Sequence, residues 1–284
     1  MSPAKRTSRA RRVRVARPTG FCFGVERAIR LAREGKRKHG RIATLGELVH
    51  NPQVLRELAA EGIRSVRSPR EAREGALVVR AHGCPPEVFE RCAGRGLTVI
   101  DATCPYVRKV QSVARRLMEG GYRVVVVGER DHPEVRSILG YCRGAGMVYA
   151  PGRRVRGGRV GVVAQTTMSR ERLRLAVANL SNSRYTELRV FDTICEEVTA
   201  RQDAAARIAA DSDLVVVVGG RSSANTSRLA EIAAEAGAEI LHVESAAELS
   251  RGKLSGFVRI GVIAGSSTPA WVVREVARSA RNPF

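Results

Sequence analysis

The sequence predicts an α/β fold with mostly parallel sheet, and two observations carry this prediction. Short apolar runs rich in β-branched residues alternate along the chain with segments whose apolar residues recur at helical spacing. Most polar motifs come directly after a predicted strand, which is where ligands bind in open parallel sheets. With 284 residues and 44% hydrophobic content, the chain can bury one large core or two to three small ones.

Each predicted strand is a short run of valine, isoleucine, leucine or alanine between polar residues or glycine. In chain order the strands are 76–80, 97–101, 122–128, 159–165, 188–193, 213–219 and 258–265. Each predicted helix carries apolar residues three or four positions apart, which places them on one face. In chain order the helices are 25–39, 107–119, 172–181, 199–210, 227–236 and 270–280.

Three cysteines divide the chain in a regular way. Cys22, Cys104 and Cys195 recur at intervals of roughly one third of the chain, and each is followed by a predicted helix and two polar loops. This rhythm predicts three similar α/β units. Their ranges are 13–100, 101–192 and 193–284, behind a basic disordered tail at 1–12, and the C-terminal helix could pack with the first unit.

The formal net charge is +21, and arginine contributes most of the excess. A chain rich in Arg, Ala, Gly and Val can reflect a GC-rich coding background. The functional interpretation is attraction to anions: nucleic acid, phosphorylated metabolites or an acidic protein. Charge alone does not choose among these. The N-terminal residues up to Arg17 carry no acid, and nonspecific contact with nucleic acid is expected of this segment at most.

Two features favour a cytoplasmic protein without membrane contact. No apolar run approaches the roughly 20 residues that a membrane-spanning helix needs. The basic N-terminus lacks the apolar middle segment of a secretory signal. In that compartment six cysteines are not expected to form disulfides, so a cysteine within a motif points to metal binding or catalysis.

Cys22, Cys104 and Cys195 are the candidate metal ligands, because each stands where a strand or loop meets a predicted helix. A helix N-terminus offers free N–H groups and a positive dipole end, which lower the pKa of a thiol and favour the metal-binding thiolate. Three thiolates fit a zinc site lacking one ligand, or a four-iron cluster with one iron left open. Buried structural thiols are the alternative. The other cysteines lack such contexts and are interpreted as buried or incidental thiols: Cys84, Cys92 and Cys142.

Three of the five histidines, His50, His82 and His132, lie in loop motifs. Histidine can bind phosphate oxygens, bind a metal or move protons, whereas a lone histidine is usually a cap or a surface group. Three histidines that all follow strand-like segments favour a functional role over this cap or surface interpretation. His39 and His242 have no such setting and are interpreted as surface residues.

Glu134 begins a predicted helix. It is either an N-terminal acid favoured by the helix dipole, or a proton donor beside a metal centre. Ser223, Asn225 and Ser267 follow predicted strands and precede helices, so they are either ordinary N-caps or an anion site. The chain contains neither a P-loop nor a convincing dinucleotide fingerprint, so an ATPase or nicotinamide dehydrogenase is not expected.

Taken together, nine motifs in a fixed order resemble the LytB-type hydroxymethylbutenyl diphosphate reductase family, from about Val13 to Arg278. They are GFCFGV, HNPQV, AHGCPP, DATCP, DHPEV, QTTMS, DTICEEVTARQ, SSANTSRL and AGSSTP. The resemblance implies a trefoil of three similar α/β units with mostly parallel sheets around a central iron–sulfur cluster. It also implies one [4Fe-4S] cluster per chain with three cysteine ligands, Cys22, Cys104 and Cys195, and one open iron.

The implied reaction removes the hydroxyl of (E)-4-hydroxy-3-methylbut-2-enyl diphosphate and yields isopentenyl and dimethylallyl diphosphate. Glu134 matches the proton-delivering acid, Thr166 matches the residue near the substrate hydroxyl, and His132 joins them as a catalytic residue. The positions that match the diphosphate site of the family are His50, His82, His132, Ser223, Ala224, Asn225 and Ser267. An acidic ferredoxin or flavodoxin is the implied electron donor.

Two alternatives compete with this interpretation. A zinc-containing basic protein that binds nucleic acid would be colourless and its affinity would depend on salt, although no recognised nucleic-acid module is visible. A reductase of the same fold could act on another allylic phosphate. Two positions depart from the family pattern: Ala224 stands where many members carry a further serine, and Cys84 where others often carry an apolar residue.

Overall fold

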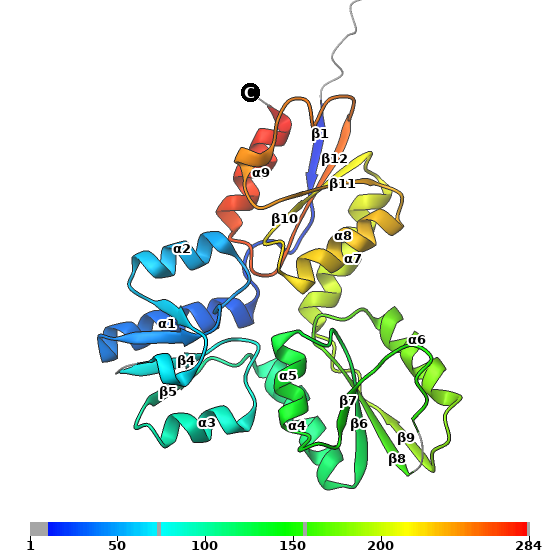
Figure 1. The fold of residues 1–284 in the computed structure, drawn as a ribbon. Coiled ribbons are helices and arrows are strands. Elements are labelled where there is room, and N and C mark those ends of the chain that lie inside the picture. Colours follow the sequence, from blue (N-terminus) through cyan, green and yellow to red (C-terminus); the bar gives the residue numbers. More distant parts are fainter. Residues whose placement is uncertain (1–10, 73–74, 156–157, 283–284) are drawn as a thin grey trace, which may run out of the picture. The chain divides into compact units, whose positions relative to one another are not determined.

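The computed structural model describes residues 11–72, 75–155 and 158–282. In this part of the chain helices alternate with short strands, and the strands form three four-stranded sheets (Figure 1). Every strand pairing among these residues is parallel. The predicted α/β class with parallel sheet is therefore confirmed.

The chain forms two compact units. Unit 1 joins the N-terminal segment up to Phe21 to the segment from Ala200 onward, and it contains sheet A. Unit 2 is Cys22–Thr199 and contains sheets B and C. Helix α7 (Glu196–Ala210) starts in unit 2 and continues into unit 1.

Sheet A has the strand order β1-β12-β10-β11. Its elements are β1 (Arg12–Val15), β10 (Leu214–Val218), α8 (Ala224–Glu235), β11 (Glu239–Val243), the 3-10 turn η2 (Ala246–Glu248), β12 (Arg259–Ala264) and α9 (Ala270–Arg281). Val216 and Val218 of β10 pack with α9, whereas the valines that alternate with them pack with α7 and α8. Burial on both faces explains why β10 is apolar throughout.

Sheet B has the order β3-β2-β4-β5, and sheet C has the order β7-β6-β8-β9. The elements around sheet B are α1 (Phe23–His39), β2 (Ile42–Leu45), α2 (Pro52–Ala60), β3 (Arg64–Val66), the 3-10 turn η1 (Pro69–Glu71), β4 (Ala76–Val79), α3 (Pro86–Ala93) and β5 (Thr98–Asp101). Those around sheet C are α4 (Pro105–Glu119), β6 (Tyr122–Val127), α5 (Pro133–Gly140), β7 (Gly146–Val148), β8 (Arg159–Ala164), α6 (Arg170–Ser181) and β9 (Glu187–Val190).

Every predicted strand and helix is present, with ends that differ by a few residues. Strands β1, β2, β3, β7 and β11 and helices α2 and α3 were not predicted. Four of these strands lie at sheet edges, where polar residues interrupt the apolar pattern that identifies a buried strand.

The N-terminal boundary needs a correction. The predicted disordered tail at 1–12 falls almost wholly outside the described residues, but Arg12 belongs to β1. Val13 of β1 is paired with Ile260 of β12, so the strand joins sheet A and not the strands that follow it in sequence (Figure 1). The partner strand is distant in sequence, so no local pattern reveals this pairing. The division into three units stays a prediction.

Because the strands are parallel, their carboxyl ends meet at one edge of each sheet, and the polar motifs lie there. His82 follows β4, Cys104 follows β5, His132 follows β6 and Thr166 follows β8. Among the described residues, none of the helices combines the length and apolar content that a bilayer-spanning segment needs.

Candidate functional site

Unit 2 brings His50, His82 and His132 together in one cluster. The ring centroids of His50 and His82 lie 4.6 Å apart, and those of His82 and His132 lie 5.3 Å apart. His50 and His132 are 6.0 Å apart. The three rings follow β2, β4 and β6, so sheets B and C both contribute to the cluster.

Burial and neighbouring charges favour the neutral forms of His82 and His132. Burial lowers the pKa of His132 to about 4, and the charges of His50 and Arg80 contribute. The pKa of His82 is well below its ordinary value, mainly through burial and then through His50, His132 and Arg80. A bound anion would oppose these effects, because it stabilises the protonated form of each ring.

Hydrogen bonds decide which ring nitrogens can donate. The Nδ1 atom of His132 accepts from the backbone N–H of Glu134 at 3.2 Å, so the proton of the neutral ring sits on Nε2. The Nδ1 atom of His50 lies 3.1 Å from Oε2 of Glu47, and an ionised carboxylate can only accept. His132 therefore presents an N–H donor and no lone pair.

The tautomer of His132 helps to decide whether the histidine cluster binds a metal cation or an oxygen anion. One ligand atom from each of His50, His82 and His132 lies within 4.8 Å of the others, a spacing that a metal ion would accept. A metal ion, however, needs a free lone pair on every ring. The lone pair of the His132 ring is already used by Glu134, and its remaining nitrogen is a donor. The arrangement therefore fits an oxygen anion better than a cation.

Arg80 is a cation beside this cluster that sequence reasoning missed. It follows β4, is half-buried, and lowers the pKa of both His82 and His132 through its charge. A Cβ at Gly46, where φ is +71°, would lie 2.6 Å from an Arg80 guanidinium nitrogen, so glycine leaves room for this side chain. The run Arg80-Ala81-His82 directly after a buried strand is the signal that could have revealed it.

Glu134 and Thr166 form a buried pair. One carboxylate oxygen of Glu134 accepts from the backbone N–H of Thr166 at 2.7 Å, and the other accepts from its hydroxyl at 2.8 Å. Burial raises the pKa of Glu134 to about 7, although both hydrogen bonds oppose the rise. The carboxyl group therefore exchanges a proton near neutral pH, which suits a general acid.

The loops around this pair are closely packed. The side-chain oxygen of Gln165 accepts from the backbone N–H of Glu129 at 2.9 Å, which joins the loops after β6 and β8. A Cβ at Gly128 would lie 2.7 Å from Val135 and 2.9 Å from Gln165, so only glycine fits between them. The backbone N–H of Cys195 donates to the carbonyl of Thr166 at 3.0 Å, which links the acid–threonine pair to a candidate metal ligand.

The three candidate ligands stand at helix N-termini, as predicted. Cys22 caps α1, and its Sγ accepts from the backbone N–H of Val25 at 3.4 Å. Cys104 is the N-cap residue of α4, and Cys195 directly precedes α7. A Cβ at Gly24 would lie 2.7 Å from Sγ of Cys104 and 3.9 Å from Sγ of Cys22. Glycine therefore leaves space beside two sulfur atoms that a larger residue would fill.

The predicted lowering of the thiol pKa is wrong for Cys104 and Cys195 in the chain without a bound cation. Burial raises the pKa of Cys104 to about 11, outweighing the N–H groups of Tyr106 and Val107, and the charges of Cys22 and Cys195 raise it further. Burial also raises the pKa of Cys195. A bound metal centre would supply the compensating positive charge and displace the protons. Three thiols within electrostatic range of one another, with space beside two of the sulfurs, fit a thiophilic centre such as an iron–sulfur cluster.

The remaining cysteines are buried thiols, as predicted. Cys84 and Cys92 pack in the core beside sheet B, and burial raises the pKa of Cys84 to about 12. Cys142 packs in the core beside sheet C. The interpretation of His242 as a surface residue is wrong, because it is half-buried in β11 and its Nε2 lies 2.9 Å from the carbonyl oxygen of Gly219. His39 is half-buried in the last turn of α1.

The other predicted site residues lie in unit 1, after the adjacent strands β10 and β12. Ser223 caps α8, and its oxygen accepts from the backbone N–H of Thr226 at 3.3 Å. Ala224 is the first residue of this helix and Ser267 is buried in the loop after β12. Asn225 is 3% exposed, and neither atom of its amide has a hydrogen-bond partner within the described residues. Buried polar groups are normally paired, so this amide fits a polar ligand.

Two threonines hold these loops against the end of the sheet. The hydroxyl of Thr268 donates to the carbonyl of Val218 at 3.0 Å. A Cβ at Gly219 would lie 2.8 Å from the hydroxyl oxygens of both Thr226 and Thr268. The close approach at Gly219 therefore fixes the loops that carry Asn225 and Ser267 at one edge of sheet A.

Comparisons with known proteins identify the family of this chain. Residues 13–281 match the family model described as LytB protein. The chain is 41% identical over 266 residues to the 4-hydroxy-3-methylbut-2-enyl diphosphate reductase of Geotalea daltonii, covering 92% of this chain and 94% of the relative. It is 40% identical over 271 residues to the enzyme of that name from Aquifex aeolicus, covering 92% and 93%.

Two solved structures are similar over almost the whole chain. One, described as (E)-4-hydroxy-3-methyl-but-2-enyl diphosphate reductase, the terminal enzyme of the non-mevalonate pathway, has a TM-score of 0.68 and 37% identity, with 96% and 99% coverage. The other is the E-1-hydroxy-2-methyl-but-2-enyl-4-diphosphate reductase from Plasmodium falciparum, with a TM-score of 0.87, 25% identity, and 96% and 89% coverage. The chain therefore belongs to the LytB protein family.

Proposed function

We propose that this chain is an oxidoreductase that removes the hydroxyl of (E)-4-hydroxy-3-methylbut-2-enyl diphosphate and forms isopentenyl and dimethylallyl diphosphate. Family membership and the names of the similar enzymes support this function. The structural observation that carries it is the Glu134–Thr166 pair, a buried acid with a pKa near neutrality that is hydrogen-bonded beside Cys195.

Membership of the LytB family implies an iron–sulfur cofactor. We assign one [4Fe-4S] cluster per chain to Cys22, Cys104 and Cys195, which leaves one iron without a protein ligand. The position of all three thiols at helix N-termini and the space beside Gly24 support this assignment. When bound, such a cluster supplies electrons and a Lewis-acidic iron for the departing oxygen.

The histidine cluster would bind phosphoryl oxygens of the diphosphate. The Nε2–H of His132 is already a donor, and His82 gains a second N–H when the anion raises its lowered pKa. The ring of His50 lies beside that of His82, with 4.6 Å between their centroids. Arg80 adds a fixed positive charge nearby.

Unit 1 offers a second set of phosphate-binding groups. These are the hydroxyls of Ser223 and Ser267, the buried amide of Asn225 and the N-terminus of α8, where free N–H groups favour an anion. Ala224 contributes no hydroxyl, so the backbone and its two neighbours carry the binding at this position.

Glu134 would deliver the proton that lets the hydroxyl leave as water. When the carboxyl group is protonated, its bond to the Thr166 hydroxyl can reverse, and Thr166 can then pass a proton to the substrate oxygen. The complete reaction consumes two electrons and two protons, breaks one C–O bond and forms one C–H bond and one water molecule. Burial of the pair limits exchange of this proton with solvent.

The proposed electron donor is an acidic ferredoxin or flavodoxin in the cytoplasm, and the net charge of +21 supports attraction to such a protein. The alternative of a zinc protein that binds nucleic acid leaves the histidine cluster and the Glu134–Thr166 pair without a role. A reductase for another allylic phosphate has no observation in its favour beyond the missing hydroxyl at Ala224.

The test starts with protein purified without oxygen, beside a Cys104→Ser variant. We expect a brown protein with about four irons per chain that turns over the substrate with reduced methyl viologen. The variant should lose colour and turnover. A native protein that stays colourless and iron-free after anaerobic reconstitution would contradict the proposal. Comparison with other allylic phosphates then tests the substrate.

A further inference from the structure

We propose that a basic groove along α9 is the docking surface for the acidic one-electron carrier protein that reduces this enzyme. We define the basic groove as the hollow of about 430 Å³ in unit 1 that Arg17, Thr19, Arg274, Arg278 and Arg281 line together with apolar residues. The inference rests on the proposed function and adds to it the place where electrons enter.

The charge of the basic groove is unbalanced. All four arginines are exposed, and none of them makes a side-chain hydrogen bond or ion pair within the described residues. No carboxylate lines the groove. Arg274, Arg278 and Arg281 share one helix face because they are four and three positions apart. Such a surface attracts and orients an acidic partner.

An exposed aromatic residue lies beside the basic groove, although it does not line it. Trp271, the only tryptophan of the chain, is 39% exposed and lies three residues before Arg274 on the same face of α9. Exposed tryptophan beside arginine is the composition that dominates binding energy at protein interfaces. A partner that covers the arginines would therefore also gain apolar contact with Trp271.

The segment that leads along the chain to Cys22 is held against the start of α9 within unit 1. A Cβ at Gly20 would lie 3.3 Å from Cβ of Ala270, the residue before Trp271. Arg201 donates to the carbonyls of Pro18 and Gly20 at 3.2 and 3.0 Å, which holds this segment in place. Gly20 is two residues before Cys22, a reach of at most about 7 Å of chain. Chain connectivity therefore places a cysteine that we assign to the cluster two residues beyond a segment that contacts the start of α9.

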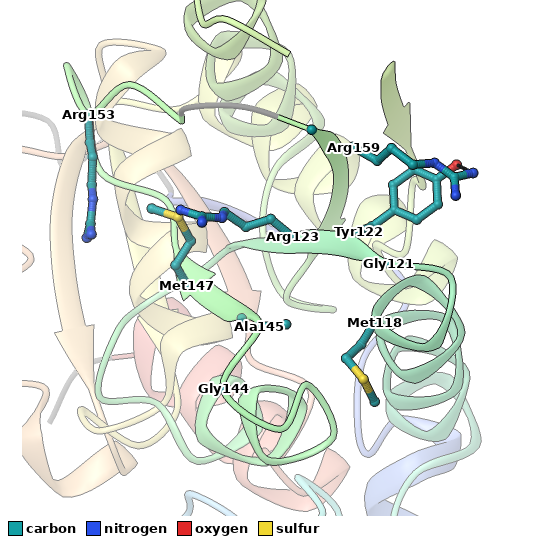
Figure 2. A pocket seen from close by; sticks show the side chains of 11 residues that line it. Met118, Gly121, Tyr122, Arg123, Gly144, Ala145, Met147, Arg153 and Arg159 are labelled. Carbon is teal, nitrogen blue, oxygen red and sulfur yellow. Dashed lines mark hydrogen bonds between the residues drawn. The ribbon is translucent and has the colours of Figure 1, made fainter. Parts of the chain in front are cut away.

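A second hollow lined by arginines differs from the basic groove in its charge pairing and in its place in the fold. It measures about 570 Å³ and lies in unit 2 at the amino ends of β6, β7 and β8, where Arg123, Arg153 and Arg159 line it (Figure 2). Arg159 is paired with Glu187 and lies against the ring of Tyr122. The cysteine-bearing loops follow the opposite strand ends, about 20 Å away over a six-residue strand. This hollow therefore provides a control surface.

Other occupants fit the basic groove less well. The N-terminal residues of the chain are basic and would be repelled. Nucleic acid shares the charge of the proposed partner, so the experiment must distinguish the two. The probes are an acidic flavodoxin and a fluorescent single-stranded oligonucleotide.

The test compares wild-type holoenzyme with Arg274→Glu/Arg278→Glu and with the matched control Arg123→Glu/Arg153→Glu, which changes the net charge equally. Flavodoxin affinity is measured by anaerobic calorimetry at two salt concentrations, and turnover is measured with flavodoxin and with reduced methyl viologen. We expect the α9 variant to bind flavodoxin about tenfold more weakly, with a smaller dependence on salt, and the control to change little. Viologen-driven turnover should stay unchanged in both.

Equal weakening in the two double variants would overturn the proposal, because net charge alone would then explain binding. Unchanged flavodoxin affinity in the α9 variant, with loss of oligonucleotide binding, would assign the basic groove to nucleic acid. Trp271→Ala provides a second test without a change of charge. If this variant binds flavodoxin as tightly as the wild type does, that result would also count against the proposed docking surface. If the proposed reductase function itself is wrong, the wild-type protein shows no viologen-driven turnover at all.

Discussion

Glu134 and Thr166 are joined by two hydrogen bonds, at 2.7 Å to the backbone N–H and at 2.8 Å to the hydroxyl of the threonine. The two hydrogen bonds have different roles, one structural and one chemical. The N–H bond orients the carboxylate, whereas only the hydroxyl bond can relay a proton to a substrate.

Thr166→Val should lower kcat about 100-fold with little change in the free energy of unfolding, because it removes the relay and keeps the orienting N–H bond. Viologen-driven turnover and urea unfolding measure the two effects. Thr167→Val removes a hydroxyl from the next residue, which accepts from Gln165, and should leave kcat within a few-fold of wild type. Equal loss in both variants would count against the relay.

Glu134 should make stability depend on pH. Its pKa is raised to about 7 in the folded chain from an ordinary value of 4.5, so the folded state holds the proton more strongly than the unfolded state. The contribution of Glu134 to the free energy of unfolding therefore falls as pH rises from about 4.5 to about 7, by roughly 3 kcal/mol in total. Glu134→Gln should remove this loss, and urea unfolding of both proteins at several pH values measures it. Parallel pH profiles would show that Glu134 ionises normally.

The histidine cluster should take up protons when it binds diphosphate. The pKa values of His82 and His132 are lowered in the free protein, so an anion that restores them must bring protons with it. The Kd for inorganic diphosphate should rise as pH increases from 6 to 8. Calorimetry in buffers of different ionisation enthalpy counts the protons. A metal site would behave oppositely, because metal binding releases protons and strengthens as pH rises.

Asn225→Ala should separate stability from function. The amide of Asn225 is buried without a hydrogen-bond partner in the described structure, so its removal should leave stability unchanged or improve it. If the amide binds a phosphoryl oxygen, KM for the substrate should rise about tenfold or more. Thermal unfolding and steady-state kinetics measure the two effects. A large loss of stability would instead identify Asn225 as a structural residue.

Gly24→Ala should prevent loading of the cluster without unfolding the chain. The added methyl would lie 2.7 Å from Sγ of Cys104, inside van der Waals contact. Iron content per chain should fall sharply while the far-UV circular dichroism remains. Gly94→Ala is a matched control, because a Cβ there meets nothing closer than 3.6 Å. Normal iron content in Gly24→Ala would show that the sulfurs can move apart.

Local pattern was sufficient for the strongly apolar strands, for most of the helices and for the order of the motifs. The apolar runs of β6 and β10 mark buried strands wherever they occur, since a strand covered on both faces has no polar positions. Polar residues after such strands then fall at the carboxyl edge of a parallel sheet. The amino-acid pattern alone is therefore enough to place Cys104 and His132 at strand ends.

Features that depend on contacts between distant parts of the chain could not be predicted from local sequence pattern. The pairing of β1 with β12 joins segments from opposite ends of the chain, and the position of Arg80 beside the histidines requires sheet B to be assembled. The direction of the Cys104 pKa was predicted wrongly, because the helix N-terminus is a local feature while desolvation comes from everything packed around the thiol. Periodicity and motif order are properties of neighbouring residues. Burial, tautomer and protonation depend on the three-dimensional surroundings, which only the folded chain creates.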